Sequence, residues 1–469
     1  MTTDAVDAVG LRDALRRGEV SARELVGAAL GLAEAHAGLG AFVSLNPELA
    51  LREAAAVDAR IAATPRDERA DLPPLIGLPT AHKDLVDQRG HLTTHGSAAV
   101  PHVIARNDGP VVQAVRAAGA VSIGKTQVPE FGIAGYSENE IAAPARNPFD
   151  PALTAGGSSG GTAAAIAAGV IPTAIGSDAG GSIRIPSAAC GLIGLKPGRG
   201  VVPADIPRTT GDPRGSRLFD ENGAPRMGVS GPMARTARDA AMLFDAILAR
   251  HDEPALEAVH RAEELRGLRI GVSFASPFES WVPIRFSAEA FAALNTAVAS
   301  LEAHGHSVEE ARIDYDPRYP EIFTTVWTSA LARIGFAAGA EQRLGTLAAM
   351  FLDRARGTAP ARLAESAAAL RRFAGDVGRQ WARYDAVLTP ALAFAPPSVG
   401  AFRERGSEGD YRLQCEWAPQ TSMVNVAGLP AVTAPTRRTV AGLPMGVQLI
   451  GRAGGELRLL QLAEQLTEA

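Results

Sequence analysis

Two glycine-flanked serine clusters and one lysine are the residues of this chain whose types and spacing could do covalent chemistry. The first cluster contains Ser158 in the run 156–161, Gly-Gly-Ser-Ser-Gly-Gly. The second contains Ser182 in the run 178–184, Asp-Ala-Gly-Gly-Ser-Ile-Arg. Lys83 follows a short apolar run upstream. A serine hydroxyl attacks a carbonyl only when a base accepts its proton, and a neutral lysine is able to be that base.

The glycines beside Ser182 predict a site for a developing negative charge. Glycine has no Cβ, so backbone N–H groups in such a run can turn toward a bound oxygen. Ala179, Gly180 and Gly181 offer consecutive N–H groups, which is what an oxyanion hole requires. A helix over 162–169 and a strand over 170–175 would separate the two serine clusters, and this spacing permits them to meet at one end of a sheet.

The elements that must position these residues alternate between helices and short apolar strands. Ser21 and Glu24 predict a capping box at a helix start, and Thr236 with Asp239 predicts another, for a helix through Leu248. The runs 121–124 and 268–272 are typical of buried strands. This order predicts an α/β fold with a large, mostly parallel or mixed sheet covered by helices on both faces.

Domain organisation is predicted to be simple, because no repeat or long linker divides residues 1–469. We expect one domain with its core at about 75–249 and 380–469, and a variable helical and loop region at about 250–380. The segment 203–226, rich in Pro, Gly, Arg and Asp, is expected to be a long surface loop.

Composition argues against several other classes of protein. Lys and Arg number 46 and Asp and Glu 51, for a net charge of −5, and no basic block favours nucleic acid. The acidic N-terminus is unlike a signal peptide, and the longest apolar stretch is too short and broken for a membrane span. Cys190 and Cys415 are expected to be buried free thiols, which suits a cytoplasmic protein.

Two other motifs in the sequence would predict a different kind of site. Ser158 also fits the Gly-x-Ser-x-Gly nucleophile elbow of α/β-hydrolases, which needs a downstream acid and a histidine. His91 and His95 would suggest a metal site if they lay on a helix, but their segment is typical of a loop, and no further ligands complete a site. We expect no bound metal.

Taken together, these segments resemble the amidase signature family of serine hydrolases. Further motifs of that family occur at 191–197, 230–236, 425–430 and 442–448. The resemblance implies that Ser182 is the nucleophile and that Ser158, in a cis peptide, bridges it to Lys83. Lys83 would be the final base, so burial must lower its pKa. Asp84, next in sequence, should point to the opposite face of the strand.

The remaining candidate residues surround this triad. Asp178 and Arg184 are expected to support the oxyanion loop as an ion pair, with a catalytic role as the alternative. Ser159 is expected to give structural support. In related enzymes the segment with Tyr136 lines the acyl pocket, so Tyr136 is expected to bind substrate, with plain packing as the alternative. Gly132 leaves room near the nucleophile, and Trp327 is a weaker pocket candidate.

The resemblance implies an amidohydrolase, a hydrolase of C–N bonds other than peptide bonds, acting through an acyl-serine intermediate. We expect small, neutral, hydrophobic or aryl amides as substrates, no metal or organic cofactor, and no nucleic-acid or membrane partner; a homodimer is left open. The alternatives are the A subunit of a tRNA-dependent amidotransferase and an α/β-hydrolase-type esterase.

Overall fold

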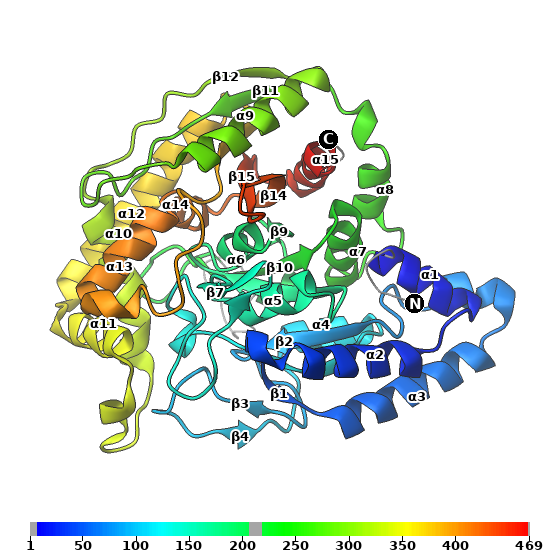
Figure 1. The fold of residues 1–469 in the computed structure, drawn as a ribbon. Helices are drawn as coiled ribbons and strands as arrows, with labels where there is room; N and C mark the ends of the chain where they lie inside the picture. Colours follow the sequence, from blue (N-terminus) through cyan, green and yellow to red (C-terminus); the bar gives the residue numbers. More distant parts are fainter. Residues whose placement is uncertain (1–6, 206–217, 468–469) are drawn as a thin grey trace.

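The strands of this chain form two main sheets, seen in a computed structural model that describes residues 7–205 and 218–467 (Figure 1). The larger sheet has eight strands in the order β12-β11-β13-β15-β14-β9-β10-β8. β11 pairs in parallel with β12 and β13, and the other pairs are antiparallel. The sheet is therefore mixed, with antiparallel pairing predominating. Its strands are β8 (Thr173–Asp178), β9 (Ile193–Lys196), β10 (Val229–Ala234), β11 (Arg269–Val272), β12 (Ser307–Glu310), β13 (Ala386–Pro390), β14 (Ala431–Arg438) and β15 (Pro444–Gly451).

The smaller sheet carries Lys83. It has the order β1-β5-β2, with β1 (Phe42–Leu45) antiparallel to β5 (Val121–Thr126) and β2 (Pro79–Lys83) parallel to it. β2 lies against β8 at the edge of the larger sheet, where Thr80 Oγ1 donates to the Thr173 carbonyl at 3.1 Å. Both strands end near the same point, which brings Lys83 close to the end of β8. Two short ribbons complete the strands: β3 (Leu92–Thr93) with β4 (Val103–Ile104), and β6 (Arg146–Asn147) with β7 (Asp150–Thr154).

Helices surround both sheets. Figure 1 shows α10 to α13 gathered on one side and α1 to α3 on the other. The helices are α1 (Ala8–Arg17), α2 (Ala22–Ala35), α3 (Pro47–Ala63), α4 (Pro110–Ala117), α5 (Gly160–Ala167), α6 (Arg184–Ala189), α7 (Ala237–Ile247), α8 (Pro254–His260), α9 (Ala288–Ala303), α10 (Tyr319–Ser329), α11 (Thr346–Gly357), α12 (Pro360–Trp381), α13 (Gly406–Trp417), α14 (Ser422–Ala427) and α15 (Glu456–Thr467). One apolar core lies around the sheets, and a second joins α10 to α14.

Local sequence signals set several of these boundaries. The capping box of Ser21 and Glu24 is present, and the Thr236 side chain accepts the Asp239 N–H at the start of α7. The strand predicted at 170–175 instead spans Thr173–Asp178. Pro172 lacks an N–H and Gly169 is left-handed at φ 74°, so the chain turns before the ladder begins.

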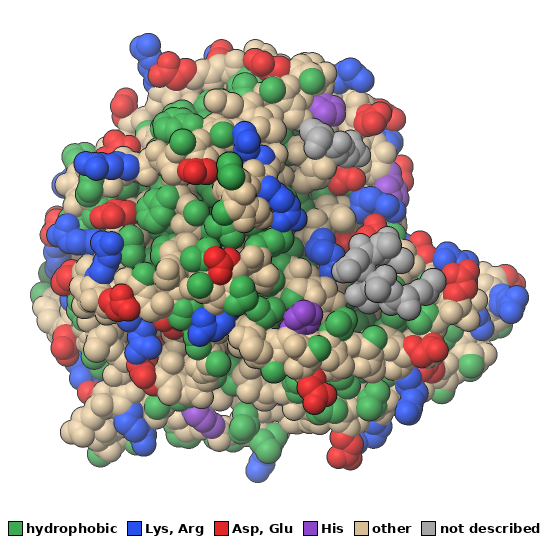
Figure 2. Space-filling model, viewed as in Figure 1, with side chains coloured by type: hydrophobic (Ala, Val, Ile, Leu, Met, Phe, Trp, Pro, Cys, Tyr) green, Lys and Arg blue, Asp and Glu red, His purple; other side chains and the backbone are tan. Residues whose placement is uncertain are grey.

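Side chains of both charges are scattered over the face in Figure 2. In the part of the chain that the structure describes, no helix combines the length and the apolar character needed to cross a membrane. The segment predicted as a surface loop, 203–226, lies partly outside the described residues, since 206–217 are not among them.

Candidate active site

Lys83, at the end of β2, makes its polar contacts with serines. Its Nζ lies 2.7 Å from Ser158 Oγ, and it donates to Ser177 Oγ at 3.0 Å and to the Ser177 carbonyl at 3.3 Å. Both Lys83 and Ser158 are almost fully buried. Among the described residues, Lys83 forms no salt bridge. The lysine therefore contacts hydroxyl and carbonyl oxygens, and no carboxylate holds its charge.

This environment changes the acidity of Lys83. Burial lowers the pKa of Lys83 to about 7, and the more distant negative charge of Asp178 opposes that shift. A buried ammonium loses its hydration, which favours the neutral amine. Near neutral pH a large fraction of Lys83 is thus uncharged, as a proton acceptor must be.

The two serine clusters meet at the end of β8, as the spacing permits. Ser159 N–H donates to the Ser182 carbonyl at 3.2 Å, and the Gly157–Ser158 peptide bond is cis. Ser159 is the N-cap residue directly before α5, and its Oγ donates to the Ser177 carbonyl at 3.5 Å. Ser182 Oγ makes no hydrogen bond within the described part of the chain, and the residue lines a cavity. Its hydroxyl is thus available to a bound molecule.

The loop before Ser182 presents backbone donors. Gly181 N–H is already used, because it donates to Asp178 Oδ1 at 2.8 Å. The N–H groups of Ala179, Gly180 and Ser182 have no acceptor among the described residues. Gly181 has φ 137°, a conformation in which a side chain would be strained. The donors that remain for an oxyanion are therefore those on either side of Gly181.

Asp178 and Arg184 hold this loop as the predicted ion pair. Arg184 donates from Nη2 to Asp178 Oδ1 and from Nε to Oδ2, each at 2.9 Å, with both side chains fully buried. Burial acts to raise the pKa of Asp178, but the Arg184 guanidinium outweighs it and holds that pKa well below its usual range. The pair therefore supports the loop, because the polar atoms of the two side chains bind each other and the loop backbone.

Two C-terminal residues complete that support. Arg184 also donates to Gln448 Oε1 and Asn425 Oδ1, both at 2.6 Å. Asn425 Nδ2 in turn donates to Asp178 Oδ1 at 2.9 Å. The motifs that contain Asn425 and Gln448 are recognisable in the sequence, but nothing there assigns these two residues a role. Only the fold shows that they close the network around the oxyanion loop.

Asp84 points away from Lys83, as strand alternation predicts. Its carboxylate accepts from Lys125 Nζ at 2.9 Å and from both the backbone and the hydroxyl of Thr94. Lys125, on the neighbouring strand β5, is fully buried with it. Lys125 was not among the residues predicted from the sequence, although a lysine directly after the predicted strand 121–124 was a signal for it.

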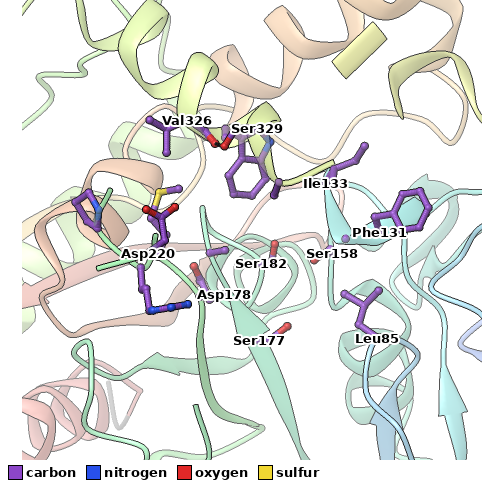
Figure 3. A pocket seen from close by; sticks show the side chains of 18 of the residues that line it. Leu85, Phe131, Ile133, Ser158, Ser177, Asp178, Ser182, Asp220, Val326 and Ser329 are labelled. Atoms are coloured by element: carbon purple, nitrogen blue, oxygen red, sulfur yellow. Dashed lines mark hydrogen bonds between the residues drawn. The ribbon is translucent and has the colours of Figure 1, made fainter. Parts of the chain in front are cut away.

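Ser158 and Ser182 face a cavity of about 410 Å³. Figure 3 shows them between Asp220 on one side and Leu85 and Phe131 on the other, with Val326 above. Gly132 and Trp327 also line the cavity, as expected. Leu85 and Phe131 give one side of the cavity an apolar surface, and Asp220 lies on the other side (Figure 3). The charged residues that line the cavity are Asp178, Arg199, Asp220, Arg226 and Arg333. Ser182 and Trp327 also line a smaller space of about 60 Å³.

The predicted substrate-binding role of Tyr136 is wrong, and the alternative, a packing residue, is what the structure shows. Its side chain lines neither of the spaces that Ser182 faces. The ring stacks on Phe402, with centroids 4.6 Å apart, and the hydroxyl donates to Asp410 Oδ2 at 2.5 Å. The neighbouring Gly132 and Gly135 do line those spaces. The segment therefore lines the pocket as predicted, but the side chain of Tyr136 does not.

Histidines take no part in this arrangement. Burial and the nearby Lys125 lower the pKa of His82 to about 3, so it stays neutral. Over residues 7–205 and 218–467, no group of three or more His, Cys, Asp or Glu side chains is placed to hold a metal ion. Cys190 and Cys415 are free and buried, as predicted. Ser158 hydrogen-bonds to a lysine, which contradicts the nucleophile-elbow interpretation.

A buried lysine–serine pair below a serine loop, at the edge of a mixed α/β sheet, defines a class of hydrolase, and comparison with known proteins identifies the family. The family model described as Amidase matches residues 24–460. The chain belongs to the amidase signature family and is a hydrolase of C–N bonds.

Individual relatives are consistent with this assignment. "Putative amidase AmiB2" of Mycobacterium tuberculosis is 37% identical over 407 residues, covering 84% of this chain and 82% of that protein. The A subunit of the glutamyl-tRNA(Gln) amidotransferase of Ralstonia nicotianae is 32% identical, covering 96% and 95%. The structure of 6-aminohexanoate cyclic dimer hydrolase with its substrate superimposes with a TM-score of 0.82 at 29% identity, covering 99% and 96%.

Proposed function

We propose that this amidohydrolase cleaves small carboxamides through an acyl intermediate on Ser182, with Ser158 and Lys83 as its proton path. The observation that carries the proposal is the 2.7 Å contact of Lys83 Nζ with Ser158 Oγ, beside a serine whose hydroxyl is available. Lys83, when neutral, accepts the proton of Ser158, which accepts that of Ser182. Ser182 Oγ then attacks the amide carbon.

The rest of the cycle follows from the same groups. The N–H groups on either side of Gly181 stabilise the oxyanion, an effect worth about 3–4 kcal/mol per donor. The proton held by Lys83 returns through Ser158 to the leaving nitrogen as the C–N bond breaks. Water then attacks the acyl-Ser182 ester, and the same path removes and returns its proton, releasing the carboxylic acid.

The cavity supports a substrate with an apolar part. Leu85, Phe131, Ile133 and Trp327 form its wall near the serines, and burying an unpaired charge against such groups is costly. We therefore propose neutral amides with aryl or hydrophobic groups at the reacting end. The charged side chains of Asp220 and Arg226 allow a polar group at the far end of the substrate.

The experiment is a panel of amides with one serine variant and its control. Amine or ammonia release is measured for 4-nitroacetanilide, hexanamide and alaninamide, and we expect the first two to react faster. Ser182→Ala should abolish turnover, and a trapped acyl group should map to Ser182 by mass spectrometry. Ser187→Ala is the matched control, because Ser187 is buried nearby and its Oγ has no hydrogen-bond partner.

Two outcomes would contradict the proposal. An acyl group on Ser158 would move the nucleophile to the first serine cluster. The alternative, a component of a tRNA-dependent amidotransferase, is favoured by the Ralstonia relative. It would be supported if glutamine were hydrolysed efficiently only with the partner proteins and charged tRNA while the amide panel stayed unreacted.

A further inference from the structure

Helix α13 contacts the wall of the active site through two side chains. Asp410 and Gln414 lie four residues apart, and Gln414 Nε2 donates to Asp410 Oδ1 at 2.7 Å. Asp410 Oδ2 accepts from the Tyr136 hydroxyl at 2.5 Å, and Gln414 Oε1 accepts from Gly135 N–H at 2.8 Å. The last two hydrogen bonds tie α13 to the segment 132–136, and the bond between Gln414 and Asp410 holds the two acceptors together on the helix.

That segment lies directly against the peptide that carries Ser158. A Cβ built on Gly157 would be 2.6 Å from the Tyr136 carbonyl carbon, so the two backbones are in contact. A Cβ on Gly132 would be 3.4 Å from Ser158 Oγ. The next residue, Ser137, accepts the Gly160 N–H at 3.0 Å and donates to the Ser158 carbonyl at 3.4 Å. A shift of 132–137 would therefore move Ser158.

We propose that Asp410 is a positioning residue, which holds the segment 132–136, and through it Ser158, at the geometry needed for proton transfer. The inference rests on the proposed role of Ser158 in that transfer. Asp410 can accept both hydrogen bonds only as a carboxylate, because a protonated acid must donate from one oxygen. Protonation of Asp410 would loosen the contact that α13 makes with this wall.

The surroundings of Asp410 bring its pKa close to the pH range in which the enzyme is assayed. Asp410 is 2% exposed. Burial raises the pKa of Asp410 to about 6; hydrogen bonds from Tyr136 and Gln414 and the charge of Arg403 oppose the shift, and Glu138 adds to it. Burial also raises the pKa of Tyr136, so its hydroxyl keeps its proton and stays a donor.

The test compares three variants with the wild-type protein, using 4-nitroacetanilide. Asp410→Asn keeps an acceptor for Tyr136 but removes the acceptor for Gln414, and Tyr136→Phe keeps the ring stacked on Phe402 while removing the hydroxyl. We expect kcat to fall about 10-fold to 100-fold for Asp410→Asn, because small displacements of catalytic groups are costly. Tyr136→Phe should lose about 3-fold to 10-fold, and the double variant no more than Asp410→Asn alone.

The matched control is Glu408→Gln, on the same helix, where the exposed carboxylate pairs with Arg354. It should leave kcat and KM unchanged. The pH profile separates positioning from mere packing. Over about one pH unit below 6 the wild-type log(kcat/KM) should fall with a slope clearly above 1, because Asp410 becomes protonated in addition to Lys83. In Asp410→Asn the slope should stay at 1.

An unchanged kcat in folded Asp410→Asn, or a slope above 1 that persists in it, would overturn the inference. If Asp410→Asn does not fold, Tyr136→Phe decides by kcat and slope, and wild-type values would likewise overturn it. Ser182→Ala is measured in parallel. Activity in Ser182→Ala would refute the proposed function, whereas an inactive Ser182→Ala beside a fully active Asp410→Asn would refute only the role of Asp410.

Discussion

Two buried lysines on neighbouring strands, Lys83 and Lys125, differ in one partner. β2 and β5 run in parallel, and His82 is opposite Lys125 in their register. Lys125 Nζ binds the Asp84 carboxylate, whereas Lys83 Nζ contacts only oxygens of Ser158 and Ser177. Burial lowers the pKa of both lysines, and only for Lys125 does a contacting carboxylate oppose that shift. Of these two lysines, the candidate base is the one that no carboxylate contacts and that lies beside the serines.

The largest effect should come from removing the amine of Lys83. Lys83→Met keeps the length and apolar stem of the side chain but removes the proton acceptor from the path through Ser158. We expect kcat/KM to fall about 10³-fold to 10⁴-fold, since loss of general-base catalysis and of an activated nucleophile act together. Steady-state rates with an aryl amide check this, with a thermal melt to establish folding. A rate within tenfold of the wild-type rate would exclude Lys83 as the base.

Removing Lys125 should affect stability instead. Lys125→Met leaves the Asp84 carboxylate buried without its cation, and such a loss destabilises a protein by about 3–5 kcal/mol. Chemical unfolding measures the change. The double variant Lys125→Met with Asp84→Asn should recover part of it, because the uncompensated charge is gone. If Lys125→Met were as stable as the wild-type protein, the two lysines would not differ as described.

The pH dependence of catalysis should follow Lys83. Lys83 accepts a proton only when neutral, so kcat/KM should be level well above pH 7 and fall as pH drops through about 7. Just below that point the fall should be about tenfold per pH unit. A rate profile from pH 5 to 10 tests this. A midpoint near 10 would mean that burial does not lower the pKa of Lys83.

The smallest effect is a gain in stability. The pKa of Lys83 is about 7 when folded and 10.5 ordinarily, so the unfolded state binds more protons between these values and stability rises with pH there. Below pH 7 Lys83 is charged in both states, and burying that charge lowers the free energy of unfolding by the full amount, about 5 kcal/mol. Lys83→Met removes this cost but also loses three hydrogen bonds, each worth about 1 kcal/mol. We expect a net gain of about 1–2 kcal/mol at pH 6 and a net loss of about 2–3 kcal/mol near pH 10.5, where almost only the hydrogen-bond loss remains; chemical unfolding at both pH values measures this.

The candidate catalytic groups were easier to predict from the sequence than their surroundings. Ser158 was predicted to bridge Lys83 and Ser182: its hydrogen bond with Lys83 is present, whereas no hydrogen bond joins its Oγ to that of Ser182 within the described residues. Ser177 was overlooked, because the strand was expected to end at 175 and in fact continues to Asp178. Tyr136 was assigned to the pocket because its segment lines it, but its side chain turns toward Asp410, on a helix far away in sequence. Such pairings depend on tertiary packing, which one sequence does not specify.

The sequence by itself determined the family, the α/β class, the two serine clusters that meet at the cavity and the opposed directions of Lys83 and Asp84. These follow from short motifs and from the alternation of side chains along a strand, which are local properties of the chain. Only the tertiary structure decided which carboxylate pairs with Lys125, how Asn425 and Gln448 close the network around Arg184, and which charged residues line the cavity. Those features join segments that lie far apart in sequence, and their geometry exists only after the sheets and helices pack.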